Sequence, residues 1–314
     1  MKRALFTIII LIGISIIGAG CFAFKKEKAT QILPAGPRPA DLVGISPEEA
    51  SKRINFVPGS QIEIRQTYLG LGAQQAEELS NGDKTGVRII TVERFAPGNY
   101  ANLNWSLSQE VETQESIQAQ TAYETGEIDI KPEVKNERLT VVGSLKNIDL
   151  KNSHKLFLPA YWPTNQAEIN GLSAIWVGTD VLEELQKTKN STIYFGILDS
   201  ALFGDMDTAK EFANAIQALR QDASIASDKT EIDLAKAEDA SNWDLMVNGE
   251  KVTVQVIKAR NWFGEIIVLN NPQNPLILKM TFNSDSMKTL ASVSGVDFLK
   301  SLLSYEVTQL NGVQ

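Results

Sequence analysis

One stretch near the start of the sequence, Ala4–Phe24, contains no charged residue. Its roughly 21 residues (ALFTIIILIGISIIGAGCFAF) would form a helix about 31 Å long, close to the hydrocarbon thickness of a lipid bilayer. We therefore predict a membrane anchor or a lipoprotein signal over residues 1–24. This prediction sets the solvent and the compartment in which the rest of the chain works.

In a first interpretation the stretch is an uncleaved signal anchor, which stays in the protein as one transmembrane helix. Lys2 and Arg3 would remain inside and the body would be exported. Lys25, Lys26 and Lys28 at the other end reduce the charge bias for this orientation to about one unit. The predicted location is the cell membrane, with the body exported behind a single N-terminal anchor.

The second interpretation centres on Cys21, the only cysteine of the chain. The segment Gly18-Ala19-Gly20-Cys21 resembles the lipobox of bacterial lipoproteins, in which a signal peptidase cuts before a lipid-bearing cysteine. Gly18 departs from the Leu, Val or Ile that is usual at that position. The resemblance implies lipidation of Cys21, and both interpretations attach the body to a membrane.

The net charge of the body restricts the kinds of partner that it can bind. The formal net charge is -8, and residues 1–28 contribute about +4, which leaves about -12 on the remainder. Nucleic acid and anionic membrane surfaces attract positive proteins, so we expect neither to bind the body. Because the body has no cysteine, it forms no disulfide and holds no metal through thiolates.

The region between the anchor and the body is predicted to be a semi-extended tether over residues 25–44, which contain Pro34, Pro37 and Pro39. The body, residues 45–314, begins at a helix-start signal. Ser46 is the expected N-cap, Pro47 the first helical residue and Glu49 the third residue of a capping box.

Alternation of apolar and polar residues dominates the body and predicts antiparallel strands. Asn248-Gly249 lies between two such runs and is a strong hairpin signal. The fold class that we expect is mainly β (α+β), an antiparallel sheet or partial barrel with a few short covering helices. We expect a C-terminal antiparallel meander over residues 243–310 and a subdivision near residues 140–240. The individual strands predicted are Gln61–Tyr68, Val87–Phe95, Leu103–Val111, Arg138–Leu145, Lys155–Leu158, Ser173–Val177 (short and buried), Thr192–Leu198 (fully buried), Asp244–Val247, Lys251–Arg260, Gly264–Asn270, Leu276–Asn283 and Tyr305–Leu310.

Three further helices are expected from N-cap signals and apolar stripes. One is capped by Asp180 and ends at Lys187, a longer one is capped by Asp207, and a short one begins at Ser294.

Residues 109–137 are more acidic than the predicted strands around them, with eight Asp or Glu and only two basic residues, Lys131 and Lys135. We expect a solvated ribbon here. A cation site is the alternative, although carboxylates spread this widely do not meet at one ion unless the fold brings them together.

The sequence gives little support to catalysis. The single histidine, His154, lies in a polar segment where a solvated side chain is expected, and no G-x-S-x-G nucleophile motif is present. We predict no catalytic residue, no metal site and no cofactor, while a pair of carboxylates that meets only in the fold stays open. Trp162 and Trp262, in turn-like settings, are candidates for ligand-facing aromatic residues.

Two segments, Ser173–Leu198 and Trp243–Phe282, resemble stretches of uncharacterised bacterial cell-envelope proteins with β-rich bodies behind a lipoprotein or anchor sequence. The resemblance implies a location in the cell envelope and a β-rich fold, and it implies no activity. Our first functional hypothesis is a membrane-tethered, non-catalytic binding or scaffolding protein of the envelope, with a lipid or another apolar molecule as the candidate ligand. The alternatives are a carboxylate-dependent enzyme acting on envelope glycans and a structural assembly subunit.

Overall fold

A computed structural model describes residues 42, 44–68, 87–157, 166–196, 232–283, 285–286 and 303–314. All of them belong to one compact unit, Pro34–Gln314. No helix in this part of the chain is long and apolar enough to cross a membrane. Several predicted features lie outside the described residues: the Ala4–Phe24 stretch with Cys21, most of the tether, Trp162, and the helices expected after Asp207 and Ser294.

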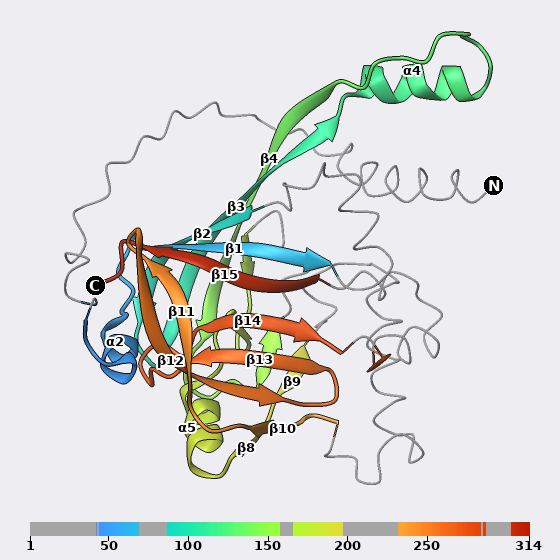
Figure 1. Ribbon diagram of the computed structural model, residues 1–314. Coiled ribbons are helices and arrows are strands. Elements are labelled where there is room, and N and C mark those ends of the chain that lie inside the picture. The colour runs from blue at the N-terminus through green and yellow to red at the C-terminus, as the bar shows by residue number, and fades with distance from the viewer. Residues whose placement is uncertain are drawn as a thin grey trace. The chain divides into compact units, whose positions relative to one another are not determined.

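The described body is mainly β, and its centre is a closed barrel of five strands (Figure 1). Each strand pairs with the next along the chain, and the last pairs back with the first. The predicted partial barrel is therefore a closed one. Its strands are β11 (Ser241–Val247), β12 (Glu250–Arg260), β13 (Gly264–Leu269), β14 (Ile277–Phe282) and β15 (Leu303–Asn311).

The odd number of strands determines how the barrel closes. Successive antiparallel strands reverse direction, so the first and fifth strands run the same way and their pairing must be parallel. Accordingly, Met246 and Val247 of β11 pair in parallel with Gln309 and Leu310 of β15, while the other four pairs are antiparallel.

The hairpin expected at Asn248-Gly249 is confirmed. It joins β11 to β12 with φ values of 50° at Asn248 and 85° at Gly249, as a type I′ turn requires. The meander from β11 to β14 follows the predicted order. Val252, Val254 and Val256 of β12 are buried, in agreement with the alternation in the sequence.

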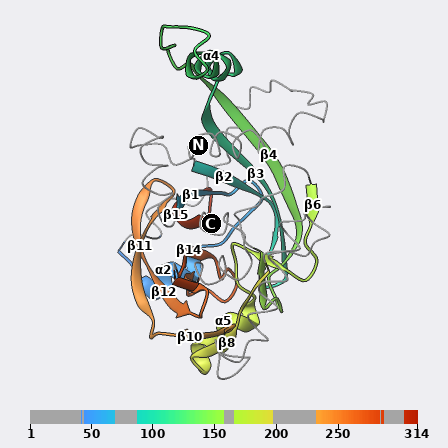
Figure 2. The same ribbon diagram turned by 90° about the vertical axis from the view of Figure 1, so that its right-hand side faces the viewer.

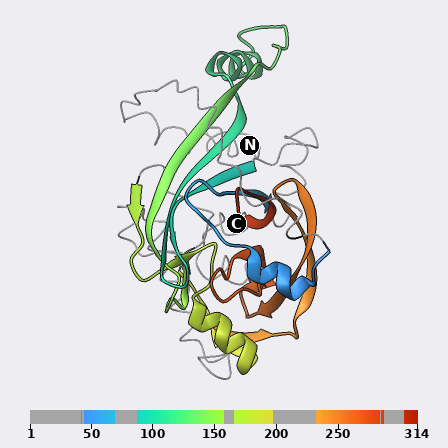
Figure 3. The same ribbon diagram turned by 90° about the vertical axis from the view of Figure 1, so that its left-hand side faces the viewer.

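Four longer strands and one short strand extend the sheet from β15 in the order β15-β1-β2-β3-β4-β6. Alternate residues such as Ile62 and Ile64 of β1 are buried, so one face of this extension covers the core. Figures 2 and 3 show these strands beside the barrel strands. The bounds are β1 (Gln61–Tyr68), β2 (Val87–Ala96), β3 (Tyr100–Glu112), β4 (Asn136–Asp149) and β6 (Gln166–Glu168).

The predicted buried strand Thr192–Leu198 is wrong in its continuity. The chain forms β8 (Asn190–Thr192), which pairs with β10 (Leu234–Ala237), and then β9 (Tyr194–Gly196), which joins a second sheet with β5 (Lys155–Phe157) and β7 (Ser173–Ala174). Only Thr192 of the predicted run belongs to β8, and the chain passes from one sheet to the other at Ile193, a change of sheet that periodicity cannot reveal. Tyr194 is exposed, contrary to full burial.

Three short helices occur in the described ranges: α2 (Pro47–Arg53), α4 (Gln114–Glu124) and α5 (Thr179–Lys187). The start of α2 is as predicted, since Pro47 is the first residue and Ser46 Oγ accepts the Glu49 amide at 3.2 Å. Helix α5 ends at Lys187 as expected, but its N-cap is Gly178, and Asp180 lies in the first turn. There its carboxylate faces the positive end of the helix dipole.

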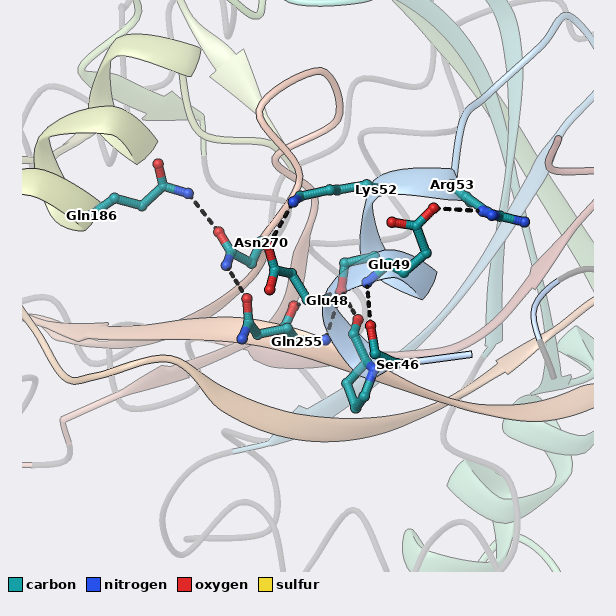
Figure 4. Close-up of polar contacts among 10 residues, drawn as sticks. Ser46, Glu48, Glu49, Lys52, Arg53, Gln186, Gln255 and Asn270 are labelled. Carbon is teal, nitrogen blue, oxygen red and sulfur yellow. Dashed lines mark hydrogen bonds and ion pairs between the residues drawn. The ribbon is translucent and has the colours of Figure 1, made fainter. Parts of the chain in front are cut away.

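A loop between β13 and β14 holds both helices against the barrel through amide side chains, and Figure 4 shows its link to α5 through Gln186, Asn270 and Gln255. Asn270 accepts a hydrogen bond from Gln186 of α5 and donates one to Gln255 of β12. Asn271 donates to the carbonyl oxygens of Ser51 and Ile54, at 2.9 and 3.0 Å. These carbonyls lie at the end of α2, where a helix runs out of amide donors, although the Ser51 carbonyl also accepts from the Ile54 amide at 3.3 Å.

Candidate functional site

The outward face of strands β2, β3 and β4 carries an open surface pocket. Side chains alternate along a strand, so Ile89 and Thr91 of β2 stand on the face opposite to buried Ile90. The register places Ile89 beside Ser106 of β3, and Ser106 beside Val142 of β4. Two exposed aliphatic side chains therefore flank Ser106, and Thr91, Asn104 and Ser144 form the neighbouring polar row.

This pocket is open and has a volume of about 440 Å³. Its lining contains no acidic residue and no histidine, so it offers no general acid, base or charged ligand for chemistry. It can hold a neutral group by apolar contact and by hydrogen bonds to hydroxyls and amides. The lining residues are Ile89, Thr91, Asn104, Trp105, Ser106, Val142, Gly143, Ser144 and Gln166.

A buried cation supports the pocket from behind. Arg88 is only 5% exposed, and its guanidinium lies 4.8 Å from the centre of the Trp105 ring. A cation over an aromatic face is attracted by the ring quadrupole. Burial lowers the pKa of Arg88 to about 10, so the group is still charged at neutral pH. We interpret this pair as a support that fixes the Trp105 side chain.

Beyond the pocket, β3 and β4 continue as a two-stranded projection that we call the arm, residues 108–140 (Figure 1). It comprises the paired strand ends, α4 and the segment 125–135 that leads back to β4. Figures 2 and 3 also place α4 at the far end of β3 and β4, away from the barrel strands. At the base of the arm, the hydroxyl oxygens of Ser108 and Thr140 are 2.8 Å apart.

The arm has almost no buried interior. Among its described side chains only Ser116 of α4 is buried. Ser116 Oγ donates to the Glu133 carbonyl and accepts from the Lys135 amide, which fastens α4 to the returning chain. Thr113 caps the helix through the Ser116 amide. Hydrogen bonds therefore hold the end of the arm together in place of apolar packing.

Large apolar side chains of the arm face solvent. Ile130 is 81% exposed and Val134 50%, and Val142 just below the arm is 58% exposed. Tyr123 and Ile128 are also exposed. The arm therefore presents aliphatic and aromatic groups to solvent on one projection.

The prediction of a solvated ribbon over residues 109–137 is right about solvation and about the strand ends, but it omits α4. That helix shows no apolar stripe in its sequence, so periodicity gives no sign of it. Within the described ranges, no three His, Cys, Asp or Glu side chains gather closely enough to hold a metal ion. The carboxylates of this segment thus remain dispersed along the arm.

The other residues singled out from the sequence lie elsewhere. Trp262 is partly buried against the core and meets the Phe263 ring edge-on at 5.0 Å, and its role as a ligand-facing aromatic stays a prediction. His154 is half-buried instead of solvated, and its Nδ1 donates to the Thr192 carbonyl at 2.8 Å. Cys21 and Trp162 lie outside the described residues.

The fold and this surface define a β-barrel protein with an extended sheet and a projecting arm. Comparison with known proteins adds no relative, because no family model, no curated protein and no solved structure matches the chain.

Proposed function

We propose that this protein is a membrane-tethered, non-catalytic scaffolding protein of the cell envelope, and that the arm binds another envelope protein. The observation that carries the proposal is the arm itself, an ordered projection with one buried side chain and several exposed apolar ones. The apolar stretch Ala4–Phe24 supports attachment to a membrane through a helix or through lipid on Cys21.

Folding energetics support a binding role for the arm. Ordering each backbone residue costs about 1–2 kcal/mol, and burial of apolar surface normally offsets most of this cost. A two-stranded ribbon without a packed face is only marginally stable in water. Binding a partner would bury Ile130 and Val134 and supply the missing apolar contact.

The pocket favours binding over catalysis. Its neutral lining offers no pair of carboxylates for glycan hydrolysis. An apolar group, such as a lipid chain or a partner's side chain, would contact Ile89 and Val142. A lipid ligand is therefore a second candidate, supported by these two exposed side chains beside the pocket.

In-cell photocrosslinking tests the role of the arm. A photocrosslinking amino acid in place of Ile130 should give a discrete adduct with one other protein. The same group in place of Glu250, an exposed residue in the β11–β12 hairpin of the barrel, is the control and should give none. No adduct from position 130, or the same adducts from both positions, would refute the proposal.

The intact mass of the membrane-extracted protein tests the mode of attachment. A chain that starts at Met1 indicates an uncleaved anchor, and a chain that starts at a lipid-modified Cys21 indicates a lipoprotein. A chain that starts after residue 28 without lipid would contradict both.

A further inference from the structure

The outer edge of β4 is largely open. On one side β4 pairs with β3 from Asn136 to Asp149. On the other side β6 covers only residues 144–146. Among the described strands no other pairs with residues 136–143, which leaves eight residues of this edge without a described partner strand.

The hydrogen-bond pattern identifies the backbone groups on this edge. The Lys146 carbonyl accepts from the Ile169 amide, so residue 146 directs its N–H and C=O away from β3. Directions alternate along a strand, and the β3–β4 register has no bulge between residues 136 and 145. The backbone groups of Asn136, Arg138, Thr140 and Val142 therefore point to the open edge.

Natural proteins usually block such edges with proline, bulges, lysine or a covering segment. Residues 136–143 (NERLTVVG) contain no proline and no lysine, and Arg138 is the only cation. An open and regular edge of this length can accept an added strand, which is a common mode of peptide recognition.

We propose that this edge of β4 binds an extended, basic segment of another protein, which adds as a strand beside residues 136–142. This inference rests on the proposed function, because it names the partner of the arm and the way in which that partner binds.

Charge selects the occupant. Residues 109–137 carry eight acidic groups against two lysines, and the whole body is acidic. Opposite charges across an interface speed association and like charges oppose it. A second copy of the chain would bring an equally acidic arm to the same edge and be repelled, whereas a basic segment is attracted to the acidic arm.

The two faces of the edge predict an alternating pattern in the bound segment. Its side chains on one face would lie beside Thr140 and Val142 and close to the pocket, where apolar or neutral residues fit. Its side chains on the other face would lie beside Glu137 and Leu139, where a basic residue can pair with the carboxylate. Alternation of basic and apolar residues is therefore the expected signature.

A synthetic peptide of seven residues that alternate lysine and valine is the probe, and the same peptide with glutamate for lysine is its control. Both are added to the detergent-solubilised full chain, and amide hydrogen exchange is measured residue by residue. The lysine peptide should slow exchange at Arg138, Thr140 and Val142, whose amides face the edge. Leu139 and Val141, already paired with β3, should not change. Uniform protection, or equal protection by the glutamate peptide, would overturn the inference.

Thr140 offers a matched pair of variants. Thr140→Pro removes one edge donor and the side-chain contact with Ser108, but no backbone hydrogen bond to β3, because the Thr140 amide points outward. Thr140→Val loses the same contact with Ser108 and keeps the amide. Peptide affinity should fall about tenfold or more in Thr140→Pro and change less than about twofold in Thr140→Val. Equal affinities would overturn the inference.

Two other outcomes separate this inference from the proposed function. Protection of the same amides that grows with protein concentration, without peptide, would show a second copy on the edge and overturn the inference. Adducts from position 130 that persist unchanged in Thr140→Pro cells would show that the arm binds differently, so the strand addition fails while the scaffolding role stands. If the photocrosslinking group at position 130 gives no adduct in cells with Thr140 intact, both the scaffolding role and the strand addition are refuted.

Discussion

Replacing Asn274 with alanine should destabilise the whole body, although this residue lies in a loop. Asn274 is fully buried between β13 and β14. Its side-chain amide donates to the Ile54 carbonyl at 3.0 Å, and its carbonyl accepts from Trp176 Nε1 at 2.8 Å. The side chain thereby joins the end of α2 to the segment that precedes α5.

The magnitude follows from what the substitution leaves behind. Each lost hydrogen bond contributes about 1 kcal/mol net, and a buried donor left without a partner costs about 1–3 kcal/mol. Trp176 is fully buried, so its Nε1 would lose its partner, whereas Ile54 keeps the bond from Asn271. We expect Asn274→Ala to lower the free energy of unfolding by about 2–4 kcal/mol.

Urea unfolding of the detergent-solubilised chain measures this change, with the slope of the transition unchanged and the midpoint lowered. The matched control is Asn270→Ala, in the same loop, whose contacts with Gln186 and Gln255 are only partly buried. That control should cost less than about 1 kcal/mol. An Asn274→Ala variant within about 0.5 kcal/mol of wild type, or equal to the control, would refute the reasoning.

The substitution Asn274→Asp tests whether the loss of stability at this site grows or shrinks as the pH rises. The carboxylate can still accept from Trp176, but it faces the Ile54 carbonyl in a buried site. Burial should raise its pKa above the ordinary value of about 4, because the charged form loses hydration. The neutral form is then favoured in the folded state, so the loss of stability should be small below pH 4 and grow as the pH rises. A loss that is constant from pH 4 to 8 would contradict this account.

Three further predictions concern the turn, the barrel and the arm. Gly249→Ala should cost about 1 kcal/mol through its positive φ alone, whereas Gly264→Ala should cost several kcal/mol in the same urea assay, because its Cβ would lie 2.1 Å from the Thr281 carbonyl oxygen. Tyr305→Phe should raise stability by about 1 kcal/mol, since the buried hydroxyl has no hydrogen-bond partner among the described residues. Burial also raises the pKa of Tyr305 well above its ordinary value, so wild type should lose stability relative to this variant as the pH rises through 10. Ser116→Ala should speed amide exchange in α4 and leave the urea midpoint of the barrel unchanged, and a shifted midpoint would contradict the independence of the arm.

Local signals predicted the local structure well. The alternation around Val252 and Val254, the Asn248-Gly249 turn and the cap at Ser46 each depend on neighbours in sequence, and each is confirmed. Closure of the barrel was not predictable in this way. It depends on β15 pairing in parallel with β11, the first strand of the barrel, which is separated from it in the chain by the three other barrel strands.

The candidate site was harder still to predict. The pocket exists only because three strands align Ile89, Ser106 and Val142, and such lateral register leaves no periodic signal. Ile130 and Val134 lie among carboxylates, so the acidic composition of residues 109–137 indicated a solvated segment and gave no sign of exposed apolar side chains. Thr113 is a helix-cap residue that could have signalled α4, but no apolar stripe follows it.

The double role of β15 has a consequence for the time course of folding. Thr308 of β15 donates to the Glu63 carbonyl of β1, 245 residues away in sequence. At a synthesis rate of about 5–20 residues per second, β1 waits roughly 10–50 s for this partner. β1 lacks this neighbour throughout that interval, and β11 and β14 lack theirs from their own synthesis until β15 emerges; open strand edges of this kind aggregate. The nascent chain should therefore depend on chaperones until β15 emerges, and any truncation before Leu303 should be degraded instead of accumulating as a shorter protein.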